Sequence, residues 1–179
     1  MHHKKTSCLI KSLLIFAALS CADSNHRMEG RWKFIPAEGT DVVTWRYNQQ
    51  ELEIARHGKE IAILQNYIYR NKVAYIDSMI FVPGGGPRTS TQTTPNWSGN
   101  WYMGVLTKIG SEKIVTGHWL EADSGLQVER EETLQTSQGE IQVRTTREYR
   151  VEGDKLVVME TRSTRPTPIK LVFERQSQE

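Results

Sequence analysis

The chain has 179 residues, of which 37% are hydrophobic and 25% are charged, a composition that fits one globular domain with a sizeable core. Its formal net charge of +2 owes much to Lys4, Lys5 and Lys11, which precede the first acidic residue. Without these lysines the chain is close to neutral, so its electrostatics give no reason to expect a nucleic-acid partner.

The first twenty residues have the pattern of a secretory leader. The three lysines make a basic start, and residues 13–19 form an apolar run that is too short to span a bilayer. Ser20 and Cys21 follow directly. One interpretation of Cys21 is an ordinary cysteine of a signal peptide that is cleaved further downstream. The other, which we favour, is a site of lipid attachment.

The sequence Ala18-Leu19-Ser20-Cys21 resembles the lipobox of bacterial lipoproteins, although the family prefers leucine where this chain has Ala18. The resemblance implies a signal peptide at 1–20, a lipidated Cys21 with a tether at 21–28, and a folded domain at 29–179. In that family an aspartate after the lipidated cysteine is associated with retention in the inner membrane. This chain has Ala22 there, so the resemblance favours an outer-membrane lipoprotein, exposed to the periplasm or at the surface. Cys8 leaves with the leader, so we expect no disulfide in the mature chain.

From Gly30 onward, apolar and polar residues alternate with a period of two, which is typical of half-buried strands. The first ordered segment, 28–35, is expected to be the closing strand of a barrel. Turns are predicted at 57–59, 70–72, 110–111, 123–125, 137–139, 153–154 and 165–168. The sequence therefore predicts an all-β fold, a single antiparallel up-and-down β-barrel of about 8–10 strands.

Residues 83–96 interrupt this rhythm. Prolines and glycines within the segment predict a long irregular loop. Its three consecutive glycines are not a phosphate-binding loop, because no Gly-Lys-Ser/Thr sequence follows them. The segment is interpreted as a mobile loop or as a lid over the mouth of the barrel.

Both ends of the domain carry a family resemblance. Gly30-Arg31-Trp32 and the last strand, 169–175, look like the calycin pattern that lipocalins and fatty-acid-binding proteins share. In that pattern a basic residue of the last strand lies across the tryptophan. Here the resemblance assigns that role to Arg175, with Lys170 as the reserve. The chain is most similar to lipocalin-like bacterial lipoproteins of uncharacterised function.

Two arginines fall on apolar strand faces. Arg147 shares a face with Val143 and Tyr149, and Arg130 shares one with Val128 and Leu134. A tight turn at 137–139 would bring the arginines opposite each other or one pair apart, and two close guanidinium groups need an anion between them.

Two anions remain possible. One is Glu132, as an internal salt bridge. The other is a ligand carboxylate, held by Arg130 and Arg147 with the Tyr149 hydroxyl as a donor. Arg147-Glu148-Tyr149 resembles the Arg-x-Tyr that binds carboxylates in fatty-acid-binding proteins. Aromatic residues, including Tyr67, Trp97 and Trp101, are expected to line an apolar wall.

No catalytic constellation is recognisable. The mature chain has no nucleophile elbow, no cysteine nucleophile and no metal-binding spacing of histidines, so we expect no enzyme, no metal and no cofactor. The sequence predicts a membrane-anchored binding protein for a small apolar or amphipathic ligand, which could be a carboxylate. The alternative is a structural or interaction lipoprotein of the envelope, whose barrel is filled by side chains and which docks another envelope protein.

Overall fold

The computed structural model describes residues 25–40, 49–94, 105–121 and 124–177. These ranges contain eleven antiparallel strands and two short 3-10 helical segments. In chain order they are η1 (Asn25–Met28), β1 (Gly30–Phe34), η2 (Pro36–Glu38), β2 (Gln49–His57), β3 (Glu60–Tyr69), β4 (Lys72–Phe81), β5 (Arg88–Thr91), β6 (Leu106–Thr107), β7 (Glu112–Trp119), β8 (Leu126–Thr136), β9 (Gly139–Glu152), β10 (Lys155–Arg162) and β11 (Arg165–Arg175).

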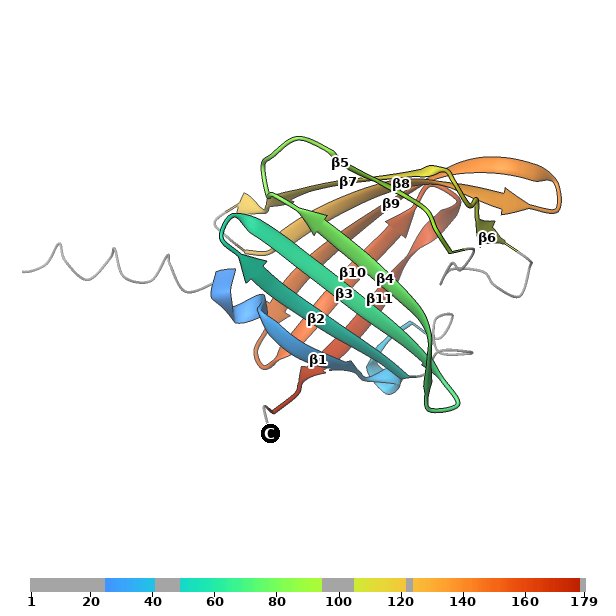
Figure 1. The fold of residues 1–179 in the computed structure, drawn as a ribbon. Coiled ribbons are helices and arrows are strands. Elements are labelled where there is room, and N and C mark those ends of the chain that lie inside the picture. The colour runs from blue at the N-terminus through green and yellow to red at the C-terminus, as the bar shows by residue number, and fades with distance from the viewer. Residues whose placement is uncertain (1–24, 41–48, 95–104, 122–123, 178–179) are drawn as a thin grey trace, which may run out of the picture.

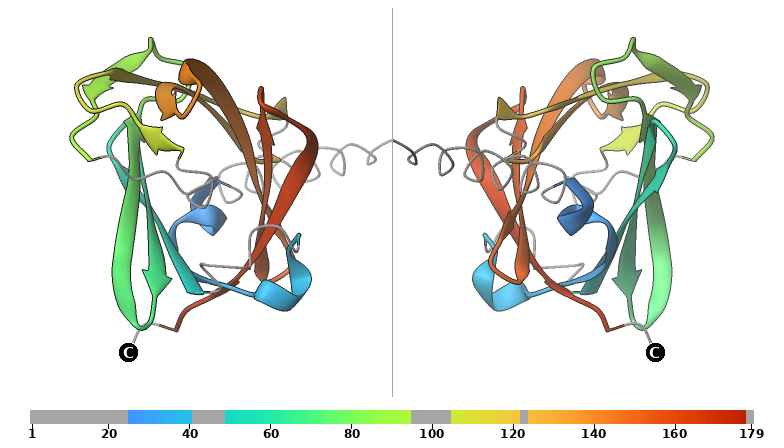
Figure 2. Two further views of the ribbon diagram at one scale, coloured as in Figure 1. Left: turned by 90° about the vertical axis from the view of Figure 1, so that its right-hand side faces the viewer. Right: turned by 90° about the vertical axis from the view of Figure 1, so that its left-hand side faces the viewer.

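The strands form one sheet that rolls up into a nearly closed barrel (Figures 1 and 2). Their order in the sheet is β4-β3-β2-β1-β11-β10-β9-β8-β7-β5, and β6 pairs with β8. The first and last strands therefore pair with each other in the middle of the sheet, where Trp32 lies opposite Arg175. The prediction of an antiparallel β-barrel is confirmed, whereas the first strand, expected to be the closing strand, lies inside the sheet beside the last strand.

The barrel closes along a seam between β4, at one end of the sheet, and β7, the strand next to β5 at the other end. No strand ladder joins them within the described residues, and individual contacts bridge the gap instead. The Lys113 ammonium donates to the carbonyl oxygen of Ser78 at 2.7 Å, and the Gly84 amide donates to the carbonyl oxygen of Gly117 at 2.8 Å. A Cβ on Gly117 would lie 2.2 Å from the Phe81 ring, so the glycine admits this ring across the seam.

Alternation of side chains along each strand places the core inside the barrel. In β3, for example, Ile61, Ile63, Gln65 and Tyr67 are buried, while the residues between them are more exposed. This is the period-two pattern of a sheet with one buried face.

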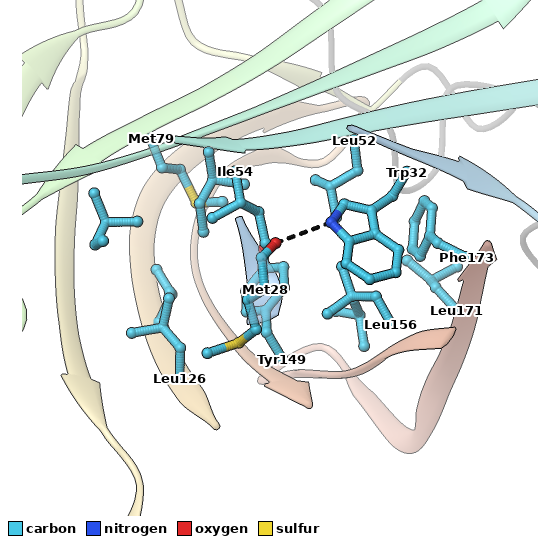
Figure 3. Packing of buried hydrophobic residues seen from close by; sticks show 14 of the residues in the cluster. Met28, Trp32, Leu52, Ile54, Met79, Leu126, Tyr149, Leu156, Leu171 and Phe173 are labelled. Atoms are coloured by element: carbon cyan, nitrogen blue, oxygen red, sulfur yellow. Dashed lines mark hydrogen bonds between the residues drawn. The ribbon is translucent and has the colours of Figure 1, made fainter. Parts of the chain in front are cut away.

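The barrel has two distinct ends. At the η1 end lie η1, the β2–β3 turn and the end of β7; at the far end lie the β3–β4 and β8–β9 turns (Figure 1). The larger apolar cluster extends to the η1 end, where Met28 packs among core residues and accepts a 2.9 Å hydrogen bond from the Trp32 indole at its carbonyl oxygen (Figure 3). A smaller cluster, Leu134 and Val143 with Val105, lies toward the far end.

The expectation that 83–96 is irregular throughout is wrong at β5. Arg88–Thr91 pairs with β7, from Arg88 opposite Val115 to Thr91 opposite Glu112. All four β5 side chains are exposed, so the segment carries no alternation of apolar and polar residues that a sequence pattern would reveal.

The predicted turn at 165–168 is also wrong, because β11 already begins at Arg165. Pro166 and Pro168 lie where the register between β10 and β11 shifts, and proline is tolerated at such irregularities. Residues 41–48 and 95–104, over which the period-two pattern also predicts strands, lie outside the described ranges.

Over the described part of the chain, we find no helix with the length and apolar character needed to cross a membrane. The same residues contain no group of three or more His, Cys, Asp or Glu side chains arranged to hold a metal ion.

Candidate ligand-binding site

Five charged side chains meet inside the barrel. Asp77 comes from β4, Arg130 and Glu132 from β8, Arg147 from β9 and Glu160 from β10, and each is at most 3% exposed. Each occupies an inward position of its strand, where the neighbouring inward residues are mostly apolar. We call these five residues the ionic cluster. Charges removed from water to this extent need partners within the protein.

Asp77 joins the two arginines. Its Oδ2 atom accepts a hydrogen bond of 2.5 Å from Arg130 Nη1 and a longer one of 3.4 Å from Arg147 Nη1. β4 is not a sheet neighbour of β8 or β9, so these bonds run through the interior and join strands that lie on the two sides of the β4–β7 seam.

The other two carboxylates each hold one arginine. Arg147 Nε donates to Glu160 Oε2 at 2.6 Å, and Glu132 Oε1 lies 3.0 Å from Arg130 Nε. Glu160 also accepts a hydrogen bond from Arg162 Nε at 2.5 Å, at the outer margin of the cluster.

Charge interactions keep the cluster ionised despite its burial. Burial opposes ionisation of Asp77, but the guanidinium groups of Arg130 and Arg147 outweigh it and hold the pKa of the carboxyl well below its ordinary value. Burial likewise disfavours the Glu160 carboxylate, yet Arg147 and Arg162 lower its pKa to about 2. For Arg147 burial is again the opposing effect, and Glu160 is the strongest of the groups that raise the pKa of the guanidinium.

A chain of polar side chains continues from Arg147 across β3 and β2. Arg147 Nη1 donates to Gln65 Oε1 at 3.0 Å, and Gln65 Nε2 donates to Gln50 Oε1 at 2.8 Å. Arg147 Nη2 also donates to the Tyr67 hydroxyl at 3.5 Å, and the Tyr67 ring stacks on Tyr75 with ring centroids 5.5 Å apart. The polar interior therefore extends from the cluster toward the far end.

Five buried polar atoms in this region make no hydrogen bond within the described part of the chain: Asp77 Oδ1, Arg130 Nε, Arg130 Nη2, Thr145 Oγ1 and Tyr149 Oη. Asp77 Oδ1 and Arg130 Nε each lie near an opposite charge, from Lys113 and Glu132 respectively. Nη2 of Arg130 and Oγ1 of Thr145 belong to residues that lie directly opposite each other on β8 and β9. Buried donors and acceptors are nearly always paired in native proteins. These two atoms could donate to a carboxylate, an amide or a hydroxyl that reached this part of the barrel.

The structure places the predicted arginines inside the barrel, one pair apart. Arg147 lies opposite Val128, and Arg130 lies opposite Thr145. Of the two anions considered, Glu132 does form an internal salt bridge, but with Arg130, and the acid that contacts both arginines is Asp77. The sequence carried a signal for Asp77 that we missed, since it occupies an inward position between Tyr75 and Met79.

The predicted aromatic residues are distributed differently. Tyr149 is buried next to Leu126 toward the η1 end, and burial raises the pKa of its hydroxyl to about 12 although Arg147 acts to lower it. Tyr67 contacts Arg147 from β3. Trp97 and Trp101 lie outside the described residues, as does Cys21.

The residues of the Gly-x-Trp resemblance lie together near the η1 end. The Arg175 guanidinium carbon is 4.1 Å from the centroid of the Trp32 ring, and Arg175 Nη1 donates to the carbonyl oxygen of Glu29 at 2.8 Å. Gly30 has φ +124°, and a Cβ there would lie 2.8 Å from Arg175 Nη1. The glycine gives both the backbone conformation and the room for this contact.

No protein-family model and no curated protein sequence matches the chain. Solved structures with similar folds include the secretary abundant heat soluble (SAHS) protein of Ramazzottius varieornatus, with 11% identity and a TM-score of 0.56 over 84% of this chain and 96% of that one. Lipid binding protein 8 of Caenorhabditis elegans matches with 10% identity and a TM-score of 0.52 over 84% and 96% of the two chains.

Fatty-acid-binding protein 1 of Echinococcus granulosus matches with 12% identity and a TM-score of 0.50, over 85% of this chain and 99% of that one. None of the three names describes an enzyme, and two of them describe lipid binders. At these identities the likeness concerns the fold. The chain thus has an antiparallel β-barrel fold similar to that of these proteins.

Proposed function

We propose that this chain is a lipid-anchored binding protein of the bacterial envelope, which holds a small hydrophobic or amphipathic ligand in its barrel. The observation that carries the binding proposal is the pair of unpartnered buried atoms, Arg130 Nη2 and Thr145 Oγ1, beside the ionic cluster. These two atoms lie next to each other and could donate to the polar head of an amphipathic molecule.

The apolar body of the ligand would lie on the far side of the cluster. Toward the η1 end the barrel is filled by its own core, from Met28 to Tyr149. Toward the far end the described interior contains the buried pair Gln50 and Gln65 and, around it, aromatic and aliphatic side chains, with Tyr67 and Tyr75 on one wall and Leu134 and Val143 on the other. Such a surface suits a hydrocarbon chain or ring.

The head group is constrained by charge. The cluster contains two arginines and three carboxylates, and Lys113 and Arg162 at its margin, with side chains 12% and 10% exposed, add two positive charges. The margin groups thereby offset the excess of acid, and the whole site tolerates a neutral polar head or a single carboxylate. A doubly charged anion would be poorly accommodated.

The binding proposal is tested by native mass spectrometry of the protein that starts at Ala22, purified gently and then denatured. We expect a reproducible extra mass that is lost on denaturation. We also expect that folded protein from which this ligand has been removed binds added hexadecanoate. Thr145→Val removes the unpartnered hydroxyl while preserving shape, so it should leave stability almost unchanged and weaken hexadecanoate binding about ten-fold.

Thr146→Val is the matched control, because Thr146 is the next residue of β9 and its side chain faces outward. It should bind like the unaltered protein. If Thr145→Val and Thr146→Val bind hexadecanoate equally well, the head group does not lie at the ionic cluster. If no mass is lost and neither hexadecanoate nor haem binds, the ligand-binding proposal fails.

The anchoring proposal rests on the lipobox-like sequence that ends at Cys21. Several acyl chains on one residue would make a stable membrane anchor. When the full-length chain is produced in a Gram-negative host, we expect it in the outer-membrane fraction, and Cys21→Ser should lose this location. Equal distribution of both proteins between the fractions would contradict lipid attachment at Cys21.

A second candidate is an interaction lipoprotein whose barrel is filled by side chains. The observation in its favour is that Asp77, Glu132 and Glu160 already provide partners for both buried arginines. This candidate predicts a bare protein mass and no effect of Thr145→Val on any ligand. It also predicts that the soluble form captures an envelope protein in cross-linking experiments.

A further inference from the structure

A recess lies at the η1 end of the barrel, away from the ionic cluster. It has a volume of about 240 Å³ and lies between the β2–β3 turn, the end of β4 and the end of β7. Its lining includes two cationic and four apolar side chains: Arg56, Lys59, Ile61, Val82, Pro83 and Trp119.

Arg56 occupies the last inward position of β2, after Leu52 and Ile54. Its guanidinium carbon lies 5.3 Å from the centroid of the Trp119 ring, and its Nε lies 3.1 Å from a carboxylate oxygen of Glu29. These two contacts fix the orientation of the guanidinium group. Nevertheless, neither Nε nor Nη2 makes a hydrogen bond, although both atoms are buried.

Lys59 adds a second positive charge from the β2–β3 turn. It is exposed and has no ion-pair partner among the residues that the structure describes. The preceding Gly58 has φ +64°, and a Cβ there would meet no atom within 4 Å, so the turn leaves this side of the recess open. With Glu29 counted against Arg56, the recess retains one positive charge.

The rest of the lining is apolar. Ile61 is buried, whereas Val82, Pro83 and Trp119 are half-buried and present hydrocarbon and indole surface to the recess. The volume lies below the range of about 300–1,000 Å³ that is usual for drug-sized ligands. An occupant must therefore be smaller than a long-chain fatty acid.

We propose that this recess binds a small organic monocarboxylate with a compact apolar or aromatic body. Its carboxylate would accept hydrogen bonds from Arg56 and Lys59, and its body would pack against Trp119, Val82 and Pro83. A guanidinium group held by an indole and by Glu29 is preorganised for such a contact. The site is independent of the ionic cluster, and it remains if the interior of the barrel binds nothing.

The test is titration of the ¹⁵N-labelled protein, starting at Ala22, with benzoate. We expect benzoate to shift the resonances of the Trp119 indole N–H and the Gly58 amide, whereas neutral benzamide should not. Arg56→Gln should weaken benzoate binding about ten-fold, because it removes a charged donor. Lys59→Gln lies in an exposed turn and should fold normally while weakening binding about three-fold.

Lys72→Gln, in the β3–β4 turn at the far end, is the matched control and should bind benzoate normally. Equal shifts with benzoate and benzamide would overturn the proposal, and so would unchanged affinity in the Lys59→Gln and Arg56→Gln variants. If inorganic phosphate produced the same shifts as benzoate with equal affinity, the recess would be a general anion site and the assignment to organic carboxylates would be wrong. Benzoate binding that persists in the presence of hexadecanoate would confirm that the two sites are separate.

Discussion

Asp77 is the residue on which the polar interior depends. In the described part of the chain it accepts hydrogen bonds from both buried arginines, and it connects β4 with β8 and β9 through the interior beside the β4–β7 seam. Removing its charge would leave Arg130 with Glu132 alone and would cancel the attraction across the interior. Loss of one partner from a buried charge pair is strongly destabilising, because the remaining charge stays out of water.

Asp77→Asn is therefore expected to lower the free energy of unfolding by roughly 3–5 kcal/mol, as measured by urea denaturation. Glu131→Gln is the control, because Glu131 also pairs with an arginine, Arg144, but their side chains are 44% and 62% exposed. It should cost about 1 kcal/mol or less. Similar small losses for the two variants would show that Asp77 does not hold the interior together.

At this scale the sequence predicted the cations better than their anion. Period-two alternation places Arg130 and Arg147 on inward faces, and the β8–β9 turn sets their separation, so local pattern was sufficient. The partner of both, Asp77, lies 53 residues before Arg130 on a strand that is not its sheet neighbour. Which side chains meet across a barrel depends on its curvature and strand order, which alternation alone does not determine.

The contact between β1 and β11 shows how a backbone conformation can serve a side chain on another strand. Gly30 combines a left-handed backbone, φ +124°, with a position directly under the Arg175 guanidinium. Gly139 has a similar φ of +118°, but a Cβ there would meet nothing within 4 Å. The two glycines therefore allow backbone strain to be separated from crowding.

Gly139→Ala should lower the free energy of unfolding by about 1–3 kcal/mol, through backbone strain alone. Gly30→Ala should cost about 1 kcal/mol more, because Arg175 must also move away from Trp32. Chemical denaturation gives both free energies, and a change in tryptophan fluorescence in Gly30→Ala alone would report the displaced guanidinium. If the two variants lowered the free energy of unfolding equally, displacement of Arg175 from Trp32 would not affect stability.

Elements with alternating burial or with glycine-containing turns were predictable from sequence. The β2–β3 turn at Gly58 and the β8–β9 turn before Gly139 are examples, since both glycines adopt positive φ. β5 was not predictable, because its four side chains are all exposed and it is held by the ladder to β7 and a surface ion pair between Arg88 and Glu60. An edge strand of this kind is defined by its neighbour.

For the molecule as a whole, the ionised cluster predicts a loss of stability in acid. The pKa of Glu160 is about 2 in the folded protein, against 4.5 ordinarily, and that of Asp77 is also lowered. The unfolded chain therefore binds these protons at higher pH than the folded chain. Their contribution to stability is complete above about pH 4.5 and is lost as the pH falls toward 2.

Urea denaturation at a series of pH values checks this prediction. The free energy of unfolding should decline steadily below about pH 4.5, and Glu160→Gln should be less stable at neutral pH with a shallower decline. A Glu160→Gln profile parallel to that of the unaltered protein would contradict the assignment.

In alkali, Tyr149 predicts a loss of stability as the pH rises, because its pKa of about 12 in the folded protein lies above the ordinary value of 10. The free energy of unfolding should fall as the pH rises from 10 to 12, less steeply in Tyr149→Phe.

The strand order has a consequence for how the chain folds. Every ladder along the path from β4 to β5 joins strands that are close in sequence except β1–β11, whose partners Trp32 and Arg175 lie near opposite ends of the chain. Loop-closure entropy disfavours early formation of such a distant pairing, so the first strand should dock last and set the folding rate. A circular permutant that starts at Arg88 and joins the original termini would visit all the strands of this path in their spatial order. It should fold to the same barrel faster, because β11 and β1 would then follow each other in sequence and their pairing would cost less loop-closure entropy.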